Sequence, residues 1–267
     1  MLDQITPVLL TYNEEPNIAR TLSNLAWAKE VIVVDSGSTD GTLEILAKFS
    51  NVRMFKRPFD THANQWRYAV EQTGIATNWI LRLDADYQLS DGLLEELAQL
   101  DPHAEANAYR ISFHYAIFSR KLLSSLYPPN TVLLRRGHFA IRDKGHTEAW
   151  YVNGPIATLR CRIIHDDWKS VEHWVRGQAR YMRREADALQ ATENRVVRWL
   201  RRNPPIMPIA VFFYCLFGRG LVLNGRAGIF YALQRMVAEA VLSLMILEQA
   251  LQSQGRNLSR DERHLSR

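Results

Sequence analysis

The stretch NWILRLDADYQL, residues 78–89, joins an apolar run typical of a buried strand to two carboxylates separated by one alanine. Asp84 and Asp86 repel each other at this spacing unless a cation or strong hydrogen-bond donors lie between them. Mg²⁺ and Mn²⁺ prefer hard oxygen ligands, and one or two carboxylates often hold Mg²⁺ together with water and phosphate oxygens. The stretch therefore predicts a divalent-cation site at a strand end, with a capped turn as the alternative for so short a motif.

The chain before this stretch alternates between β-rich and helical segments. The β-rich runs are ITPVLL, EVIVVD and NVRMF, and the segments with helical character are residues 16–26, 42–49 and 62–72. Such alternation predicts βαβ units and an α/β fold with a mostly parallel sheet flanked by helices. Polar loops follow three of the strands, and ligands collect at the carboxyl ends of strands in open α/β sheets. Residues 109–165 predict an extension of the sheet that covers the site.

Length and composition allow one large α/β domain with an appendage. The chain has 267 residues, a mass of 30.8 kDa and 47% hydrophobic residues, which is ordinary for a folded protein. The two cysteines, Cys161 and Cys215, have neither metal-ligand nor redox spacing. The first residues show no charged region and cleavage site of a signal peptide. We therefore expect a protein that is cytosolic in its redox chemistry and is not exported.

The loop after the second strand, DSGSTDGT, carries two aspartates with different expected roles. A carboxylate at a strand end can accept a hydrogen bond from a ribose hydroxyl or a base N–H, and this favours Asp35 as a ligand-binding residue. Asp40 stands just before a helical segment and is expected to cap it. The first loop, TYNEE, runs into Pro16, a residue suited to the first turn of a helix.

Three motifs taken together carry a resemblance. VLLTYNEEPNI (residues 8–18), VIVVDSGSTDGT (31–42) and WILRLDAD (79–86), in this order and spacing, resemble the inverting nucleotide-sugar glycosyltransferases of family 2 with a GT-A fold. That family includes many enzymes of bacterial polysaccharide and lipopolysaccharide synthesis. The specific motifs cover about residues 1–100, and the resemblance continues more loosely to the C-terminus.

The resemblance implies roles for individual residues. The first loop and the aspartate after the second strand would hold the nucleoside, and the D-x-D would hold a Mg²⁺ or Mn²⁺ ion on the donor diphosphate. The segment THANQWRYAV would bring a polar side chain to the donor, although a solvated helix face explains that segment equally well. The donor-binding candidates are Thr11, Asn13, Glu14, Asp35, Gln65, Arg67 and Asp84, and the metal candidates are Asp84, Asp86 and His165.

Inverting transfer also needs a base that takes the proton from the attacking hydroxyl. KGHTEAW, with His146 and Glu148, lies where lipopolysaccharide-core members of the family carry a His/Glu motif. The resemblance therefore implies Glu148 as the base and Asp143 as the second candidate, against the alternative of a surface carboxylate. His165, in RIIHDDW, is expected at the metal or diphosphate, unless ordinary hydrogen bonds satisfy it.

Three further observations bear on the subgroup and the phosphate contacts. Arg180 and Tyr181 lie in the basic amphipathic helix expected over residues 171–200. They are candidates for phosphate contact, because arginine forks match phosphate geometry. Tyr87 stands where lipopolysaccharide-core relatives often carry an acidic residue, and Asn224 stands where an aspartate is expected. Both departures weaken assignment to that subgroup and leave the wider family intact.

The C-terminal part of the chain combines basic charge with apolar helices. Residues 176–202 hold eight arginines against three acidic residues, which accounts for the chain's net charge of +5. The apolar helices of this part are expected to be too short or too interrupted to span a bilayer, which takes roughly 20 apolar residues. IMPIAVFFYCLF, residues 206–217, is shorter than that and contains Pro208. A basic amphipathic helix over residues 171–200 beside apolar helices predicts binding to an anionic membrane surface. A helical subdomain or an oligomer interface is the alternative.

These observations predict a catalytic GT-A-like domain over residues 1–168 and a membrane-associating helical region over 169–267. The expected activity is transfer of a sugar from a nucleotide diphosphate sugar to a membrane-associated glycolipid or polysaccharide precursor, at the cytoplasmic face of the plasma membrane, with peripheral attachment. Nucleotidyl transfer on a similar sheet is the alternative reaction. A nucleic-acid-binding protein, favoured by arginines interleaved with aromatic residues, leaves the carboxylate loops unexplained, so no nucleic-acid partner is expected. The oligomeric state stays open.

Overall fold

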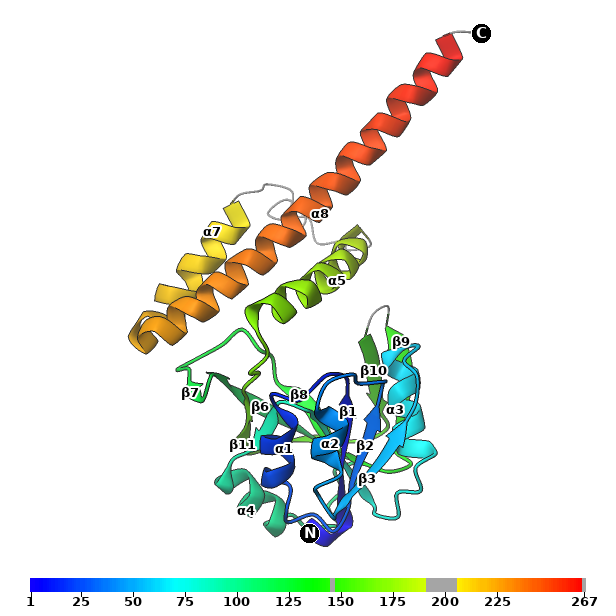
Figure 1. Ribbon diagram of the computed structural model, residues 1–267, viewed down its shortest axis with the longest axis vertical. Helices are drawn as coiled ribbons and strands as arrows, with labels where there is room; N and C mark the ends of the chain where they lie inside the picture. Colours follow the sequence, from blue (N-terminus) through cyan, green and yellow to red (C-terminus); the bar gives the residue numbers. More distant parts are fainter. Residues whose placement is uncertain (145–146, 191–205, 266–267) are drawn as a thin grey trace. The chain divides into compact units, whose positions relative to one another are not determined.

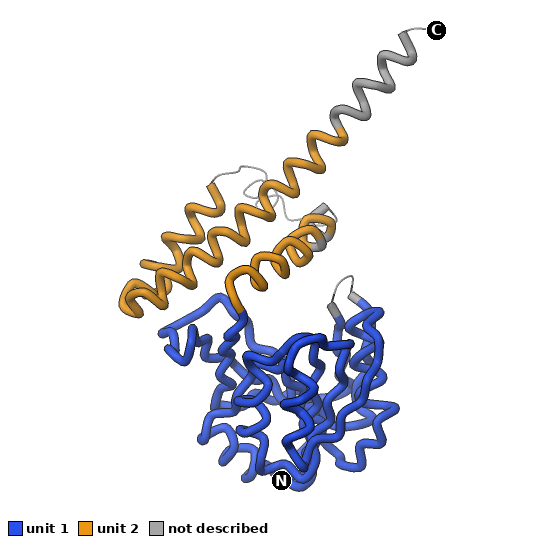
Figure 2. Tube along the Cα trace, in the orientation of Figure 1, with its two compact units in different colours: residues 1–169 blue, residues 170–267 orange. Residues whose placement is uncertain are grey.

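The computed structural model describes residues 1–144, 147–190 and 206–265. The chain divides into two compact units, Met1–Lys169 and Ser170–Arg267 (Figure 2). The first unit contains the sheet and all the strand-end loops that the sequence singles out. All the secondary-structure elements described in the second unit are helices.

A nine-stranded mixed sheet forms the centre of the first unit (Figure 1). Its strands lie in the order β3-β2-β1-β4-β8-β6-β11-β5, and β7 pairs with β6; β9 and β10 form a separate hairpin. The strands are β1 Ile5–Thr11, β2 Val31–Asp35, β3 Val52–Lys56, β4 Trp79–Asp84, β5 Tyr87–Leu89, β6 Ala108–Ile117, β7 Arg120–Lys121, β8 Asn130–Arg135, β9 Phe139–Lys144, β10 Thr147–Val152 and β11 Ile156–His165.

Five short helices are described in the first unit. They are the 3₁₀ helix η1 Leu2–Gln4 and the α-helices α1 Ile18–Asn24, α2 Thr42–Leu46, α3 His62–Glu71 and α4 Asp91–Gln99. Helices α1, α2 and α3 connect the parallel strands β1, β2, β3 and β4. The Thr61 side chain accepts a hydrogen bond from Asn64 N and caps α3, and Ser90 caps α4 in the same way through Leu93 N. The three helical segments expected before β4 are thus confirmed, although α1 and α2 are shorter than predicted.

The predicted α/β class is confirmed, but the sheet is mostly parallel only in its first half. Strands β3, β2, β1 and β4 run parallel, whereas β8 is antiparallel to both β4 and β6, and β5 is antiparallel to β11. A parallel pair needs a long crossover, usually a helix, whereas antiparallel strands accept shorter connections. No helix separates β6, β7 and β8, so an antiparallel arrangement follows there.

Both faces of β1, β2 and β4 are buried, which explains their nearly continuous apolar sequences. Successive side chains along a strand point to opposite faces. Val8 therefore joins a cluster with Trp66 of α3, whereas its neighbour Leu9 joins the larger cluster with Leu22 of α1 and Leu93 of α4. Packing on both faces fixes the position and the register of these strands.

The strand register sets the position of the polar loops. Leu10 pairs with Asp84 across β1 and β4, and Thr11 pairs with Asp35 across β1 and β2. The ends of these three strands therefore lie at one edge of the sheet, as the sequence predicts. We call this the carboxyl edge.

The second unit contains α5 Val171–Gln190, α7 Ile206–Phe213, the π-helical turn η2 Tyr214–Gly218, the 3₁₀ turn η3 Leu221–Asn224 and α8 Gly225–Leu265. Helix α8 packs against both α5 and α7. The predicted basic helix over 171–200 is present as α5 up to Gln190, and its remaining residues lie outside the described residues. The apolar helices expected at the C-terminus are confirmed.

The expectation that every apolar tail segment is too short or interrupted to span a bilayer is wrong for α8. This helix runs without a break for 41 residues. The segment Leu221–Ser253, which begins in η3 and continues in α8, is long and apolar enough to cross a membrane by length and composition. The isolated charges Arg235, Glu239 and Glu248 do not end the helix, because all are good helix formers. The shorter segment Ile206–Gly218 stays below that length.

Candidate functional site

Asp35 sits fully buried at the carboxyl edge and accepts hydrogen bonds on both oxygens. Its Oδ1 accepts from the Thr11 hydroxyl at 3.0 Å and the Ser38 hydroxyl at 2.5 Å, and its Oδ2 accepts from the N–H groups of Gly37 and Ser38 at 2.9 Å. Thr11 and Asp35 are thus brought together as predicted. Their observed contacts close the loop after β2, and contact with a nucleoside stays a prediction.

The loop after β1 is joined to the loop after β2. Asn13 has a left-handed backbone conformation, with φ of 54°, and its side-chain oxygen accepts a hydrogen bond from Thr39 N at 2.8 Å. Glu14 N donates to the Thr42 hydroxyl at 2.8 Å. Asp40 accepts from the N–H and the hydroxyl of Thr42, the first residue of α2, which is the helix-start role expected for it. Backbone geometry thus holds Asn13 and Glu14 beside the second loop.

Gln65 is likewise buried and shared between neighbouring segments. Its Nε2 donates to the Ser36 hydroxyl at 2.8 Å and to the Arg57 carbonyl at 3.0 Å, while its Oε1 accepts from the Arg57 guanidinium. The residue therefore supports the loop after β2 from α3. The alternative of a solvated helix face is wrong for Gln65, because its side chain is fully buried.

Asp84 and Asp86 follow β4 at the same edge, and the protein leaves their charges incompletely compensated. Although solvent reaches Asp84, the protein around it and then the negative charge of Asp86 raise the pKa of Asp84. Burial alone would raise the pKa of Asp86, but the charge of His165 and its hydrogen bond outweigh burial and lower it. The surroundings of the pair thus favour a charged Asp86 beside an Asp84 that is more easily protonated.

His165, at the end of β11, lies against the second carboxylate. Its Nε2 is 3.1 Å from Asp86 Oδ2, and the rings of Tyr87, Tyr115 and Tyr127 pack around it with centroids 4.6–5.2 Å away. Burial lowers the pKa of His165, but Asp86 outweighs burial and the net shift is upward. Contact of His165 with a metal or diphosphate stays a prediction. The partner that the structure shows for His165 is Asp86, which is itself a metal candidate.

The donor set fits a divalent cation held mainly by carboxylates. Asp86 Oδ1 is buried and has no hydrogen-bond partner among the described residues, so a hard oxygen ligand is available at the carboxyl edge. In residues 1–144, 147–190 and 206–265 there is no group of three or more His, Cys, Asp and Glu side chains arranged for a metal. Asp84 and Asp86 would therefore supply the protein ligands, and water and phosphate oxygens the others.

The two candidate bases lie on the β9–β10 hairpin. Glu148 and Asp143 are directly opposite each other in the register. Glu148 Oε1 is 3.2 Å from Arg82 Nη1 of β4, and Asp143 Oδ2 is 3.2 Å from Arg67 Nη2 of α3. The side chain of Glu148 is 12% exposed and that of Asp143 is 49% exposed. Glu148 is therefore not a surface carboxylate, which rules out that alternative for this residue; His146 lies outside the described residues.

The family model for glycosyl transferase family 2 matches residues 7–168, more than half of the chain and nearly all of its first unit. The chain belongs to glycosyl transferase family 2. The sequence resemblance is thus confirmed at the level of the family, and the carboxylates, the two polar loops and the β9–β10 hairpin all lie inside the matched range.

Curated relatives of this family 2 member match over about a third of its length. The lipopolysaccharide core biosynthesis glycosyltransferase LpsC of Rhizobium meliloti is 30% identical over 100 residues, which cover 36% of each chain. An uncharacterized glycosyltransferase of Rickettsia bellii is 36% identical over 95 residues, covering 35% of this chain and 31% of the relative. The chain thus matches about a third of the length of these relatives.

Solved structures similar to this family 2 member are distant. Staphylococcus aureus TarS, residues 1–349, in complex with UDP-GlcNAc is 15% identical, with a TM-score of 0.49 over 93% of this chain and 91% of that chain. Glucosyl-3-phosphoglycerate synthase from Mycobacterium tuberculosis, in complex with Mn²⁺, UDP and phosphoglyceric acid, is 21% identical, with a TM-score of 0.34 over 42% of this chain and 43% of that chain.

Sequence reasoning missed the contacts that the segment after β11 makes with α1. The Asn17 side chain donates to Asp167 at 2.8 Å, the Arg20 guanidinium donates to Asp166 at 3.0 Å, and Lys169 forms an ion pair with Glu14. Asp166 N also donates to the Asp86 carbonyl at 3.1 Å. The polar run HDDWK, residues 165–169, could have indicated these contacts, but His165 was its only residue among the predicted site residues.

Glu14 is the residue most affected by that packing. Burial raises the pKa of Glu14 to about 7, against the opposing effect of Lys169. Its carboxylate pairs with Lys169 in the structure, and its predicted contact with the donor stays a prediction. Arg180 and Tyr181 lie on α5 in the second unit, and their predicted phosphate contacts also stay predictions.

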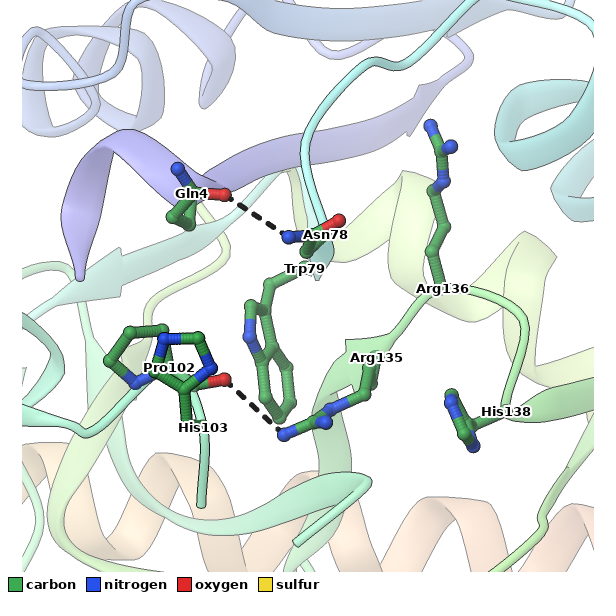
Figure 3. Close-up of a pocket in the computed structure, with 8 residues that line it drawn as sticks. All are labelled: Gln4, Asn78, Trp79, Pro102, His103, Arg135, Arg136 and His138. Carbon is green, nitrogen blue, oxygen red and sulfur yellow. Dashed lines mark hydrogen bonds between the residues drawn. The ribbon is translucent and has the colours of Figure 1, made fainter. Parts of the chain in front are cut away.

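A cavity of about 490 Å³ opens away from the carboxyl edge, at the amino ends of β1 and β4 (Figure 3). Its lining includes Arg135, Arg136, His103 and His138. The Arg135 guanidinium lies over the Trp79 ring and donates to backbone carbonyls of the loop after α4, and the Arg136 side chain points away from it. The basic groups do not converge on one point, so we place the functional site at the carboxyl edge.

Proposed function

We propose that the chain is an inverting glycosyltransferase that uses a nucleoside diphosphate sugar. The observation that carries the proposal is the carboxyl edge of a family 2 chain. There a buried oxygen of Asp86, which has no partner within the part of the chain that the structure describes, lies beside Asp84 and next to the loops after β1 and β2. A carboxylate pair suits a divalent cation on a diphosphate. The loops that contain Asn13 and Asp35 would bind the nucleoside.

In this proposal, the residues of the chain bind, orient and move a proton. Asp84 and Asp86 would hold a Mg²⁺ or Mn²⁺ ion, which, when bound, supplies positive charge to the departing diphosphate. The acceptor hydroxyl oxygen forms a bond to the anomeric carbon as the bond from that carbon to the phosphate oxygen breaks, and the electron pair leaves with the diphosphate. Glu148 takes the hydroxyl proton. Asp143 remains the second candidate for this step.

The proposed acceptor is a glycolipid or polysaccharide precursor at the cytoplasmic face of the plasma membrane, as in lipopolysaccharide synthesis. Support comes from the named function of LpsC and from the exposed apolar side chains of α7 and η2 in the second unit. Ile209, Phe213, Tyr214 and Phe217 are each at least 50% exposed. Such a surface suits the interfacial region of a bilayer, and α8 adds an apolar helix of spanning length.

The decisive experiment incubates the full chain with Mn²⁺, a panel of UDP-, GDP- and dTDP-sugars, and a bacterial glycolipid extract. Release of nucleoside diphosphate together with a glycosylated lipid of inverted anomeric configuration is expected. Release of pyrophosphate instead would establish the alternative, nucleotidyl transfer.

Calorimetry on a double variant tests the metal assignment. Replacing both Asp84 and Asp86 with asparagine should abolish Mn²⁺-dependent binding of UDP, and unchanged binding would contradict the assignment.

Sedimentation with liposomes tests the membrane part separately. The full chain should sediment increasingly as the fraction of anionic lipid rises, because both basic charge and exposed apolar area contribute. Replacing Phe213 and Phe217 with serine should weaken sedimentation, whereas the same change at Phe59, an exposed phenylalanine of the first unit, should not. A chain that stays in the supernatant at every lipid composition would show that these helices pack on protein.

A further inference from the structure

Arg82 stands two residues before the first metal candidate, in β4. Side chains at i and i+2 of a strand point to the same face, so Arg82 and Asp84 share one face of the sheet. Arg82 is only 9% exposed, and its Nη1 is 3.2 Å from Glu148 Oε1. One strand therefore carries both a metal candidate and the partner of the candidate base.

Aromatic rings enclose this ion pair. The Arg82 guanidinium lies 5.5 Å from the Trp66 ring of α3 and 5.2 Å from the Trp150 ring of β10. Trp150 Nε1 also donates to Glu148 Oε1 at 3.3 Å, and the two tryptophan rings meet edge to face at 5.6 Å. A guanidinium is favoured over aromatic faces and holds a carboxylate in a fixed direction. The enclosure therefore restricts the positions that the Glu148 carboxylate can take.

The contacts of Glu148 leave one oxygen for chemistry. Among the described residues, the hydrogen bond and the ion pair that Glu148 makes both go to Oε1. Oε2 is then the oxygen that can receive a proton from an acceptor hydroxyl. Asp143 differs, because its partner Arg67 is 40% exposed and the ion pair lies at the surface, where such pairs hold geometry weakly.

We propose that Arg82 is a positioning residue that fixes the Glu148 carboxylate relative to the Asp84–Asp86 loop and thereby makes Glu148, rather than Asp143, the base. This inference rests on the proposed glycosyltransferase function. Arg82 makes no contact with substrate in this proposal. It acts through Glu148, by holding Oε1 so that Oε2 faces the hydroxyl proton.

Kinetics of Arg82→Gln test the proposal with the best donor of the panel. We expect kcat to fall by about 10- to 100-fold, part of the usual value of a positioned base, while the donor KM stays within about twofold. The acidic limb of the kcat–pH profile should move to higher pH, because a positive charge next to a carboxylate has been removed. Arg82→Lys should recover part of kcat, since it keeps the charge but loses the planar fork.

Two comparisons separate positioning from a general loss of structure. Arg142→Gln changes an arginine of the same hairpin, one that lies over Tyr151, and should leave kcat within about twofold. In the Glu148→Gln background, Arg82→Gln should lower kcat no further, because the two residues act as one unit. An unchanged kcat in Arg82→Gln, or an equal further loss in the Glu148→Gln background, would overturn the proposal.

Carbodiimide labelling read by mass spectrometry follows the carboxylate without any need for turnover. Labelling of Glu148 should be several-fold faster in Arg82→Gln and in Arg82→Lys than in the wild-type chain, whereas labelling of Asp143 should not change. If the wild-type chain releases no nucleoside diphosphate from any donor, the proposed function fails, and labelling still decides whether Arg82 holds Glu148. Equal labelling of Glu148 in all three chains would overturn the inference.

Discussion

Asp35 ends β2 and Asp86 follows β4, both at one edge of one sheet, yet the contacts that the protein makes with the two carboxylates differ. Asp35 accepts four hydrogen bonds from protein groups and is fully buried. Asp86 has one oxygen bound by His165 and a second buried oxygen that has no partner among the described residues. Sequence patterns assigned Asp35 to the nucleoside and Asp86 to the metal. The hydrogen bonds around the two carboxylates show that their structural roles differ.

The difference indicates how polar groups divide between building a site and working in it. A buried carboxylate with all its acceptor positions filled stabilises the loop around it, because each charge-assisted hydrogen bond compensates part of the cost of desolvation. A buried oxygen without a partner costs free energy until something binds to it. We therefore expect substitutions at Asp35 to act mainly on folding and substitutions at Asp86 mainly on binding.

The largest effect on stability is expected for Asp35→Asn. The amide removes the charge and places an N–H₂ group against at least two donors, so the free energy of unfolding should fall by about 2–4 kcal/mol. Denaturant unfolding of the metal-free chain, followed by tryptophan fluorescence, measures the change. A loss below about 1 kcal/mol would show that Asp35 has no greater structural role than Asp86.

Glu14 lies between these extremes, because it is buried and paired with Lys169 but keeps a pKa of about 7. The pKa in the folded state is above the unfolded value of 4.5. The contribution of Glu14 to the free energy of unfolding is therefore fully present below pH 4.5 and is lost as the pH rises through about 7. The expected loss is roughly 2–3 kcal/mol between pH 5 and pH 8.

Glu14→Gln isolates this contribution from the other titrating groups. We expect the free energy of unfolding of the wild-type chain, minus that of Glu14→Gln, to decrease as the pH rises from 5 to 8. Denaturant unfolding at four pH values in this range provides the measurement. A difference that is constant with pH, or that grows with pH, would show that Lys169 dominates over burial and keeps Glu14 ionised at neutral pH.

The edge of the sheet could be predicted from sequence because it depends on strands. Apolar runs gave the positions of β1, β2 and β4, and parallel pairing then had to bring Thr11, Asp35 and Asp84 to one edge. The partners of these residues could not be predicted in the same way. The pairing of Arg82 with Glu148, and of Lys169 with Glu14, joins residues 66 and 155 positions apart. No local pattern encodes such contacts.

The helical unit shows a different limit. The apolar helices were expected to be too short or too interrupted to span a bilayer, but helix propensity continues through Glu239 and Glu248, and α8 is one helix. Periodicity and length of the apolar stretch had to be weighed together there. The sheet arrangement after β4 was missed for a related reason, because strand direction in residues 109–165 depends on connections that carry no clear sequence signal.

The smallest effect on stability is expected for Asp86→Asn, the same chemical change as in the first prediction. The amide oxygen can still accept from His165, and the repulsion with Asp84 is relieved, so the free energy of unfolding of the metal-free chain should change by less than about 1 kcal/mol. The effect should appear on adding ligands instead. Mn²⁺ and UDP should raise the melting temperature of the wild-type chain and of Asp91→Asn, a matched change at an exposed carboxylate, because a ligand that binds only the folded state stabilises it. They should not raise that of Asp86→Asn. A chain with Asp86→Asn that still gains the full Mn²⁺-dependent shift would place the metal on other ligands and would remove the contrast with Asp35.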